Sequence, residues 1–298
     1  MSDELPIKSI FKAYDIRGIV GSELSTAIVK KIGQAIGTTA LSQKQKTICV
    51  GYDGRLSSPS LSATLIDGLL STGINVIDIG LCTTPMLYFS NFNQETGTGV
   101  MITGSHNPPE YNGFKIVINK KTLSSNDIQN LYQIILDSNF LTGEGNKKSL
   151  SIKSQYLDEI SDSIKLKRPM KVAIDCGNGA AGVCAEDLFK KLGVETEPLF
   201  CDVDGNFPNH HPDPSNPKNL LDLKDALKKG GSELGLAFDG DADRLGVVTK
   251  DGEIIFPDRQ LLLFSEAVLK ECPQSSIIFD VKSTRHLFSW IKEKGGIP

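Results

Sequence analysis

Short apolar runs along the chain alternate with longer segments in which apolar residues recur every three or four positions. Three apolar runs end in an acidic residue followed by a turn: 48–53, 172–175 and 277–280. Each leads into a stretch of helical periodicity, and glycine closes two of these stretches, at Gly193 and Gly295. Strands followed by amphipathic helices that stop at glycine are typical of βα units, which build sheets covered by helices.

The three units are too far apart for a solenoid repeat. We interpret them as equivalent points in successive, similar three-layer α/β domains with mixed sheets. The expected helices span residues 58–71, 183–192, 259–270 and 285–294. The expected domains are residues 1–150, 151–252 and 253–298, and the first of them ends in the polar stretch 142–149.

The boundary near residue 252 depends on a hairpin pattern. Asp251-Gly252 separates two apolar runs, 245–249 and 253–256, which is a strong hairpin signal. Residues 253–298 then offer one hairpin arm, two helices and a single strand at 277–280, too little to close a sheet core. We therefore expect the third domain to be incomplete in this chain, and the polypeptide to be a shortened version of a longer one.

Composition narrows the class of protein. The 298 residues are 39% apolar and 23% charged, which excludes a disordered, collagenous or fibrous chain. The net charge of −4 shows no excess of basic residues of the kind that binds nucleic acid. No apolar run is long enough for a membrane helix. The opening Met1–Pro6 carries acid where a signal peptide needs base, so we expect a cytoplasmic protein. The six cysteines form no CxxC pair, and we expect no disulfide.

The richest candidate loop follows an apolar strand that ends at Thr103. It reads TGSHNP over residues 103–108 and places the hydroxyl of Ser105, the imidazole of His106 and the amide of Asn107 at a strand end. Ligands of α/β sheets bind at such ends, and a serine nucleophile there needs a base or an electrostatic partner. The pattern lacks the G-x-S-x-G of serine hydrolases, which counts against acyl transfer. An ordinary polar turn stays open as an alternative.

The second loop places three carboxylates, Asp239, Asp241 and Asp243, within five residues after the apolar run 234–238. Like charges this close need a compensating cation, and oxygen ligands suit Mg²⁺ or Mn²⁺. An EF-hand is excluded because Arg244 stands where that loop requires glycine. An aspartyl-phosphate phosphatase is disfavoured by Asp243 at the fifth position of its motif. A solvated acidic turn balanced by Arg244 stays open.

Three further segments carry weaker signals. Residues 11–18 (FKAYDIRG) combine an aromatic side chain with an arginine, a pair that can recognise a sugar phosphate but equally fits a plain strand. His210-His211 lacks a third ligand at helical spacing, so we interpret it as part of a structured loop. The basic stretch 165–171 is interpreted as a solvated interdomain linker.

Four motifs in this order and spacing resemble those of the α-D-phosphohexomutases, most of all the bacterial phosphomannomutase/phosphoglucomutase branch. They are FKAYDIRG at 11–18, TGSHNP at 103–108, DCGNG at 175–179 and DGDADR at 239–244. The related phosphoglucosamine mutases typically open with an FGTDGIRG-like segment, from which residues 11–18 depart. The resemblance implies a four-domain protein whose first three domains are similar α/β units.

The resemblance also implies a reaction and a cofactor. Mannose and glucose phosphates would be interconverted between their 1- and 6-phospho forms through a phosphoserine at Ser105 and a 1,6-bisphosphate. Mg²⁺ would be held by that phosphoserine and by Asp239, Asp241 and Asp243, and the chemistry suits metal-assisted phosphoryl transfer. The other catalytic groups implied are His106, Lys115 and Arg244, and the substrate ligands implied are Tyr14, Arg17, Asn107 and Lys282.

The family's sugar-recognition loop and the phosphate loop of its fourth domain are absent from these residues. We therefore expect little or no turnover from this chain. The alternatives are a phosphoglucosamine mutase, or a Mg²⁺-dependent sugar-phosphate-binding fragment without catalysis. The expected partners are small hexose phosphates, with no nucleic acid and no membrane, and a monomer is favoured.

Overall fold

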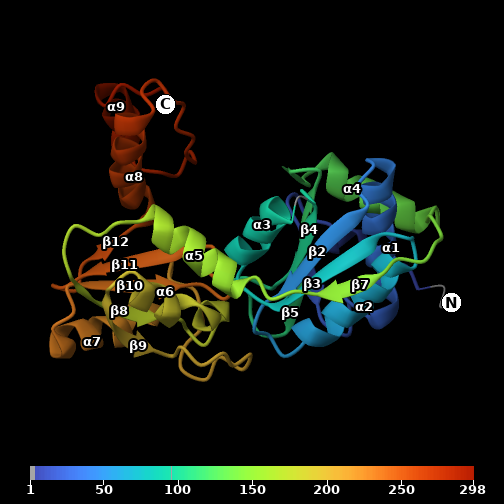
Figure 1. The fold of residues 1–298 in the computed structure, drawn as a ribbon, viewed down its shortest axis with the longest axis horizontal. Helices are drawn as coiled ribbons and strands as arrows, with labels where there is room; N and C mark the ends of the chain where they lie inside the picture. Colours follow the sequence, from blue (N-terminus) through green and yellow to red (C-terminus); the bar gives the residue numbers. More distant parts are fainter. Residues whose placement is uncertain (1–3, 95) are drawn as a thin grey trace.

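A computed structural model describes residues 4–94 and 96–298 and shows two sheets, each flanked by helices, followed by a helical pair (Figure 1). Of the acidic N-terminal opening, Met1–Asp3 lie outside the described residues. Every helix in the described ranges is too short or too polar to cross a bilayer.

The first sheet is mixed and has the strand order β1-β5-β4-β2-β3-β7, with β6 paired to β5. Strands β2, β3, β4 and β7 run parallel, whereas β5 is antiparallel to both β4 and β1. The strands are β1 (Ile16–Ile19), β2 (Thr47–Tyr52), β3 (Asn75–Leu81), β4 (Gly99–Ile102), β5 (Tyr111–Ile118), β6 (Lys121–Thr122) and β7 (Lys147–Ser149).

Helices cover both faces of this sheet. In β2, Ile48 and Val50 join the core beneath α1, α2 and α4, while Cys49 between them joins the core beneath α3. Helices α1 and α2 can approach closely because residue 33 is glycine. A Cβ at this position would lie 2.4 Å from the Leu65 carbonyl oxygen. The helices are η1 (Lys8–Ile10), α1 (Thr26–Ser42), α2 (Ser58–Leu70), α3 (Thr84–Asn93) and α4 (Asn126–Leu136).

The second sheet has the order β12-β11-β10-β8-β9 and is also mixed. Its strands are β8 (Lys171–Asp175), β9 (Glu195–Leu199), β10 (Leu234–Phe238), β11 (Leu245–Thr249) and β12 (Ile254–Ile255). Its helices are α5 (Lys153–Ser163), η2 (Ala180–Val183), α6 (Ala185–Lys191), η3 (Pro217–Leu220) and α7 (Leu221–Gly230). The two expected mixed-sheet α/β units are therefore confirmed.

Two details of this second unit differ from the pattern or extend it. The helix expected over residues 183–192 is divided into η2 and α6, because Cys184 has a non-helical φ of −143°. The hairpin at Asp251-Gly252 is confirmed, with Gly252 at a φ of +83°. Its second arm, β12, pairs with β11, so residues 254–255 belong to the second sheet although we placed the boundary at 252.

The last part of the chain consists of α8 (Pro257–Glu271) and α9 (His286–Glu293), which pack through Leu269, Leu287 and Ile291. The prediction of a strand at residues 277–280 is wrong. Only an isolated bridge joins Ser276 to Ile297, and no neighbouring strand in the described residues offers the apolar run a partner. Ile278 is accordingly 91% exposed.

Candidate active site

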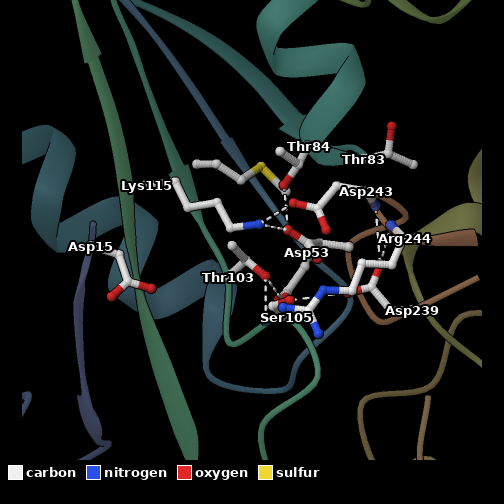
Figure 2. A network of polar contacts seen from close by, with 12 residues as sticks. Asp15, Asp53, Thr83, Thr84, Thr103, Ser105, Lys115, Asp239, Asp243 and Arg244 are labelled. Atoms are coloured by element: carbon white, nitrogen blue, oxygen red, sulfur yellow. Dashed lines mark hydrogen bonds and ion pairs between the residues drawn. The ribbon is translucent and has the colours of Figure 1, made fainter. Parts of the chain in front are cut away.

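The candidate site lies where loops from the two sheets meet. Three loops contribute, each at the carboxyl end of a strand: Asp53 follows β2, residues 103–107 follow β4, and residues 239–244 follow β10. Figure 2 shows the amino group of Lys115 reaching toward Asp243, and Ser105 and Arg244 lying beside Asp239, with Asp15 standing apart. Residues more than 120 positions apart in the sequence therefore become neighbours, as the strand-end argument predicts.

Ser105 is buried and held in a constrained backbone conformation. Its φ of +50° is unusual for a residue with a side chain. Its amide donates to Thr103 Oγ1 at 2.7 Å, which helps to fix this conformation. The Ser105 hydroxyl donates to Asp239 Oδ2 at 3.0 Å, and His106 Nδ1 lies 3.3 Å from Ser105 Oγ. The serine thus joins the first loop directly to the carboxylate loop.

A buried arginine organises the serine loop from behind. Arg55 is 1% exposed, and its guanidinium donates to four carbonyl oxygens of the loop. The acceptors are Ser105 (2.8 Å), Asn107 (2.6 Å), Pro108 (2.6 Å) and Tyr111 (3.0 Å). A Cβ on Gly104 would lie 2.4 Å from this guanidinium, so the glycine is needed for the arginine to pass. One side chain therefore fixes the path of the loop.

Asp53 holds that arginine and the start of the loop. One carboxylate oxygen accepts from Thr103 Oγ1 at 2.8 Å and faces Arg55 Nε at 3.3 Å, and the other accepts from the Ser58 hydroxyl. Burial raises the pKa of Asp53, and the charge of Arg55 and these hydrogen bonds oppose that shift. The carboxylate is therefore saturated by groups of its own sheet.

The three aspartates of the second loop form the one group of three or more ligating side chains in residues 4–94 and 96–298 that could hold a metal ion. One oxygen from each of Asp239, Asp241 and Asp243 lies within 4.8 Å of the others. Burial, followed by repulsion from Asp241 and Asp243, raises the pKa of Asp239 to about 8. Asp241 Oδ1 is fully buried and has no hydrogen-bond partner among the described residues. Negative charge is thus concentrated here beyond what the neighbouring donors satisfy.

Two groups of the first sheet reach Asp241. Lys115 Nζ lies 2.6 Å from Asp241 Oδ2 and also contacts Asp243. The hydroxyl of Thr84, at the start of α3, donates to the same Asp241 oxygen, and the Thr84 amide donates to the Asp241 carbonyl at 2.9 Å. Burial opposes ionisation of Asp241, but Lys115 outweighs it and lowers the pKa of the carboxyl. The position also benefits from the positive end of the α3 dipole.

Arg244 and His106 lie at the open side of this cluster. Arg244 is half exposed, and its Nε is 3.9 Å from Asp239 Oδ2. Burial, followed by the charge of Arg244, lowers the pKa of His106. The backbone carbonyl of His106 accepts from His211 Nε2, so the His210-His211 segment braces the serine loop.

Of the four residues predicted to bind substrate, two line a cavity beside the serine loop and two are exposed. Arg17 and Asn107 line one cavity of about 410 Å³ beside the serine loop, although the Asn107 amide already donates to the Gly104 carbonyl and Arg17 pairs with Asp15. Tyr14 is 75% exposed. Lys282 lies in the exposed segment between α8 and α9, where its ion pair is with Asp280. A larger cavity of about 590 Å³ lies at the amino ends of β2 and β3, away from these residues.

Sequence reasoning missed Arg55, Asp53 and Thr84 as site residues. The signal for the first two was present, since Asp53-Gly54-Arg55 ends an apolar run in the same way as Asp239-Gly240-Asp241 does. Thr84 carries no such signal, because its role comes from the contact between the two sheets.

Comparison with known proteins identifies both units. Residues 8–142 match the family model described as phosphoglucomutase/phosphomannomutase, alpha/beta/alpha domain I, and residues 154–252 match domain II of the same description.

Individual relatives cover almost the whole chain. A phosphoglucomutase of Neisseria meningitidis serogroup A is 55% identical over 291 residues, and a phosphomannomutase/phosphoglucomutase of Pseudomonas aeruginosa PAO1 is 50% identical over 290. Each match covers 97% of this chain and 63% of the relative. The crystal structure of a phosphoglucomutase/phosphomannomutase family protein from Burkholderia thailandensis superposes with a TM-score of 0.95 at 48% identity, covering 99% of this chain and 66% of that one.

Proposed function

Because the chain belongs to the phosphoglucomutase/phosphomannomutase family, we propose that it acts in the interconversion of 1-phospho and 6-phospho hexoses, the mannose and glucose phosphates. In this proposal Ser105 carries a phosphoryl group and passes it to the free hydroxyl of the sugar phosphate. The resulting 1,6-bisphosphate then returns its other phosphoryl group to Ser105. The chain spans about two thirds of the length of its relatives, and the proposal concerns the part of the reaction that these residues serve.

The position of Ser105 is the observation that carries the proposal. Its hydroxyl is 3.0 Å from Asp239 and 3.3 Å from His106 Nδ1, and the adjacent carboxylates are bridged by Lys115. Phosphoryl transfer needs positioning and neutralisation of charge more than covalent assistance. A buried hydroxyl on a fixed loop, facing a charged cluster, meets the first requirement.

The carboxylate cluster fits a divalent ion. Asp239, Asp241 and Asp243 supply hard oxygen ligands, and the unpartnered Asp241 Oδ1 is a ligand atom without another use in the described residues. In our proposal these three residues and the phosphorylated Ser105 would hold Mg²⁺. The ion would neutralise charge on the phosphoryl oxygens.

The chain's own side chains divide the remaining tasks. Asp239 and His106 are within reach of the Ser105 hydroxyl proton, and Lys115 and Arg244 place fixed positive charge beside the reacting group. Arg17, Asn107 and Tyr14 would contact the sugar phosphate from the first sheet, and Lys282 would do so from the last segment. Arg55 touches none of the reacting atoms and acts as a positioning residue for the serine loop.

The test is direct detection of the phosphoserine. The chain is incubated with Mg²⁺ and glucose 1,6-bisphosphate, and its intact mass is measured. We expect the mass to increase by one phosphoryl group that maps to Ser105, and Ser105→Ala to abolish the increase. Ser161→Ala, at a partly exposed position of α5, is the matched control and should still be labelled.

Two outcomes would overturn the proposal. If the chain is not labelled under conditions that label a full-length relative, Ser105 does not carry a phosphoryl group as proposed. A label on Asp239 that survives Ser105→Ala would instead favour an aspartyl-phosphate phosphatase.

A further inference from the structure

Two cysteines lie side by side at the carboxyl ends of β8 and β9. These strands are parallel neighbours, Cys176 directly follows the first, and Cys201 follows the second by two residues. The two sulfurs are 3.2 Å apart. No other pair of cysteine sulfurs in residues 4–94 and 96–298 is in contact.

The backbone already holds the two segments in register. The Cys176 amide donates to the Leu199 carbonyl at 3.1 Å, and the Asn178 amide donates to the Phe200 carbonyl at 2.8 Å. Asp175 pairs with Leu199, so Cys201 lies one position beyond the residue opposite Cys176, and the side chains nevertheless bring the two sulfurs to 3.2 Å. A covalent bond between these sulfurs therefore requires only a small local adjustment.

The pair is asymmetric in its access to solvent. Cys176 is fully buried, whereas Cys201 is partly exposed. The contact with Cys201, followed by burial, raises the pKa of Cys176, so this sulfur stays a thiol. An oxidant in solution therefore reaches Cys201 first. Cys176 lies next to it and is placed to form the disulfide once Cys201 is oxidised.

The other four cysteines lack this arrangement. Cys49, Cys82 and Cys184 are buried and Cys272 is exposed, and none of the four has another cysteine sulfur in contact among the described residues; the sulfur that Cys82 contacts is that of Met101, at 3.9 Å. Burial raises the pKa of Cys49 and that of Cys184, the latter to about 11, and the pKa of Cys176 is raised as well, so the contact with Cys201 and not the pKa distinguishes Cys176.

We propose that Cys176 and Cys201 are a reversible oxidation site that forms a disulfide when the protein meets a hydroperoxide. The Cys201 sulfur attacks the O–O bond of hydrogen peroxide and becomes a sulfenic acid, and one water is released. The Cys176 sulfur then attacks the sulfenic sulfur, the S–S bond forms, and a second water is released. The two thiols give up two electrons and two protons, and a dithiol reductant returns both by thiol–disulfide exchange.

The bond would form directly behind the carboxylate loop. The segment that begins at Cys176 continues to Ala180, whose amide donates to the Gly240 carbonyl at 2.9 Å. Gly240 in turn packs against the Ser105 carbonyl, where a Cβ would come within 2.4 Å. Oxidation therefore restrains a loop that supports both halves of the candidate site. The oxidation itself does not depend on the proposed function.

The experiment uses the whole chain with Cys272→Ser, which removes the exposed thiol. The protein is treated with a small excess of hydrogen peroxide, unfolded under non-reducing conditions and titrated for free thiols. We expect two of its five remaining thiols to disappear, with a cross-linked peptide pair containing Cys176 and Cys201 in the digest. Dithiothreitol should restore all five.

Matched variants separate this pair from general oxidation. Adding Cys184→Ser should leave the loss at two thiols, whereas adding Cys201→Ser should abolish the disulfide. The proposal is overturned if Cys201 proceeds to sulfinic acid without cross-linking, or if peroxide that oxidises free glutathione completely leaves all five thiols intact. The cross-link mapping uses no substitution at either cysteine, so it decides the matter even where Cys201→Ser fails to fold.

Discussion

Two strand-end loops of this molecule both begin with Asp-Gly, yet they balance charge in different ways. The carboxylate of Asp53 is paired with Arg55 and surrounded by donors from its own sheet. The carboxylate of Asp241 depends on Lys115 and Thr84 from the other sheet, and one of its oxygens has no partner in the described residues. Both oxygens of Asp53 are engaged by groups of the first unit, although Arg55 Nε beside them has no hydrogen-bond partner in the described residues, whereas Asp241 keeps an unpartnered oxygen that could bind a ligand.

The difference separates a structural carboxylate from one suited to a ligand. A buried charge that is fully paired fixes the fold around it, and its loss leaves the partner uncompensated. A buried charge with an unused oxygen costs free energy until a cation arrives. The contrast explains why similar Asp-Gly turns support positioning in one sheet and metal binding, as we propose, in the other.

The largest expected effect is that of Arg55→Met. It removes four hydrogen bonds to loop carbonyls and leaves Asp53 buried without its cation. The free energy of unfolding should fall by about 3–5 kcal/mol, measured by urea denaturation. Arg168→Met, which breaks the exposed pair with Glu233, is the control and should change stability little. Equal effects of the two substitutions would show that Arg55 stabilises the fold no more than an exposed ion pair does.

Asp241→Asn should act mainly on metal binding. For the parent chain, Mg²⁺ at about one hundred times its dissociation constant should add about 2.7 kcal/mol of stability, and Asp241→Asn should abolish most of it. Asp53→Asn should lower stability yet keep the full response to Mg²⁺. Thermal unfolding with and without Mg²⁺ measures both. An unchanged Mg²⁺ response in Asp241→Asn would contradict the assignment.

A third strand-end carboxylate gives the smallest effect and a pH dependence. Asp175 is buried and pairs with His210 at 2.9 Å. Burial alone would lower the pKa of His210, but the hydrogen bond and charge of Asp175 outweigh it and raise the pKa. The pair therefore contributes fully to the free energy of unfolding below the ordinary histidine pKa of about 6.5. This contribution is lost as the pH rises through the raised pKa that His210 has in the folded protein.

The pH prediction is checked by unfolding at pH 5.5 and 8.5. The stability advantage of the parent chain over His210→Gln should be larger at the lower pH. His286→Gln, at an exposed position on α9, should show no such difference. If the stability advantage of the parent chain instead grew with pH, protonated His210 would not be the form that stabilises the pair with Asp175.

Much of the fold could be predicted from local pattern. The apolar runs located β2 and β8, and the helical periodicity located α2, because the pattern of apolar residues follows from which side chains each element buries. The strand expected at residues 277–280 failed because a strand needs a partner, and local pattern does not say whether one is present.

The sequence by itself determined which residue types stand at the strand ends: Ser105 after one strand and three aspartates after another. It also determined the family, since four motifs in fixed order are local properties of the chain. Only the tertiary structure decided that Ser105 faces Asp239, that Arg55 fills the space behind the serine loop, and that Lys115 and Thr84 bridge to Asp241. Those contacts join residues 50 to 157 positions apart, and their energies depend on burial and distance, which arise only when the first sheet has formed and the two sheets have packed together.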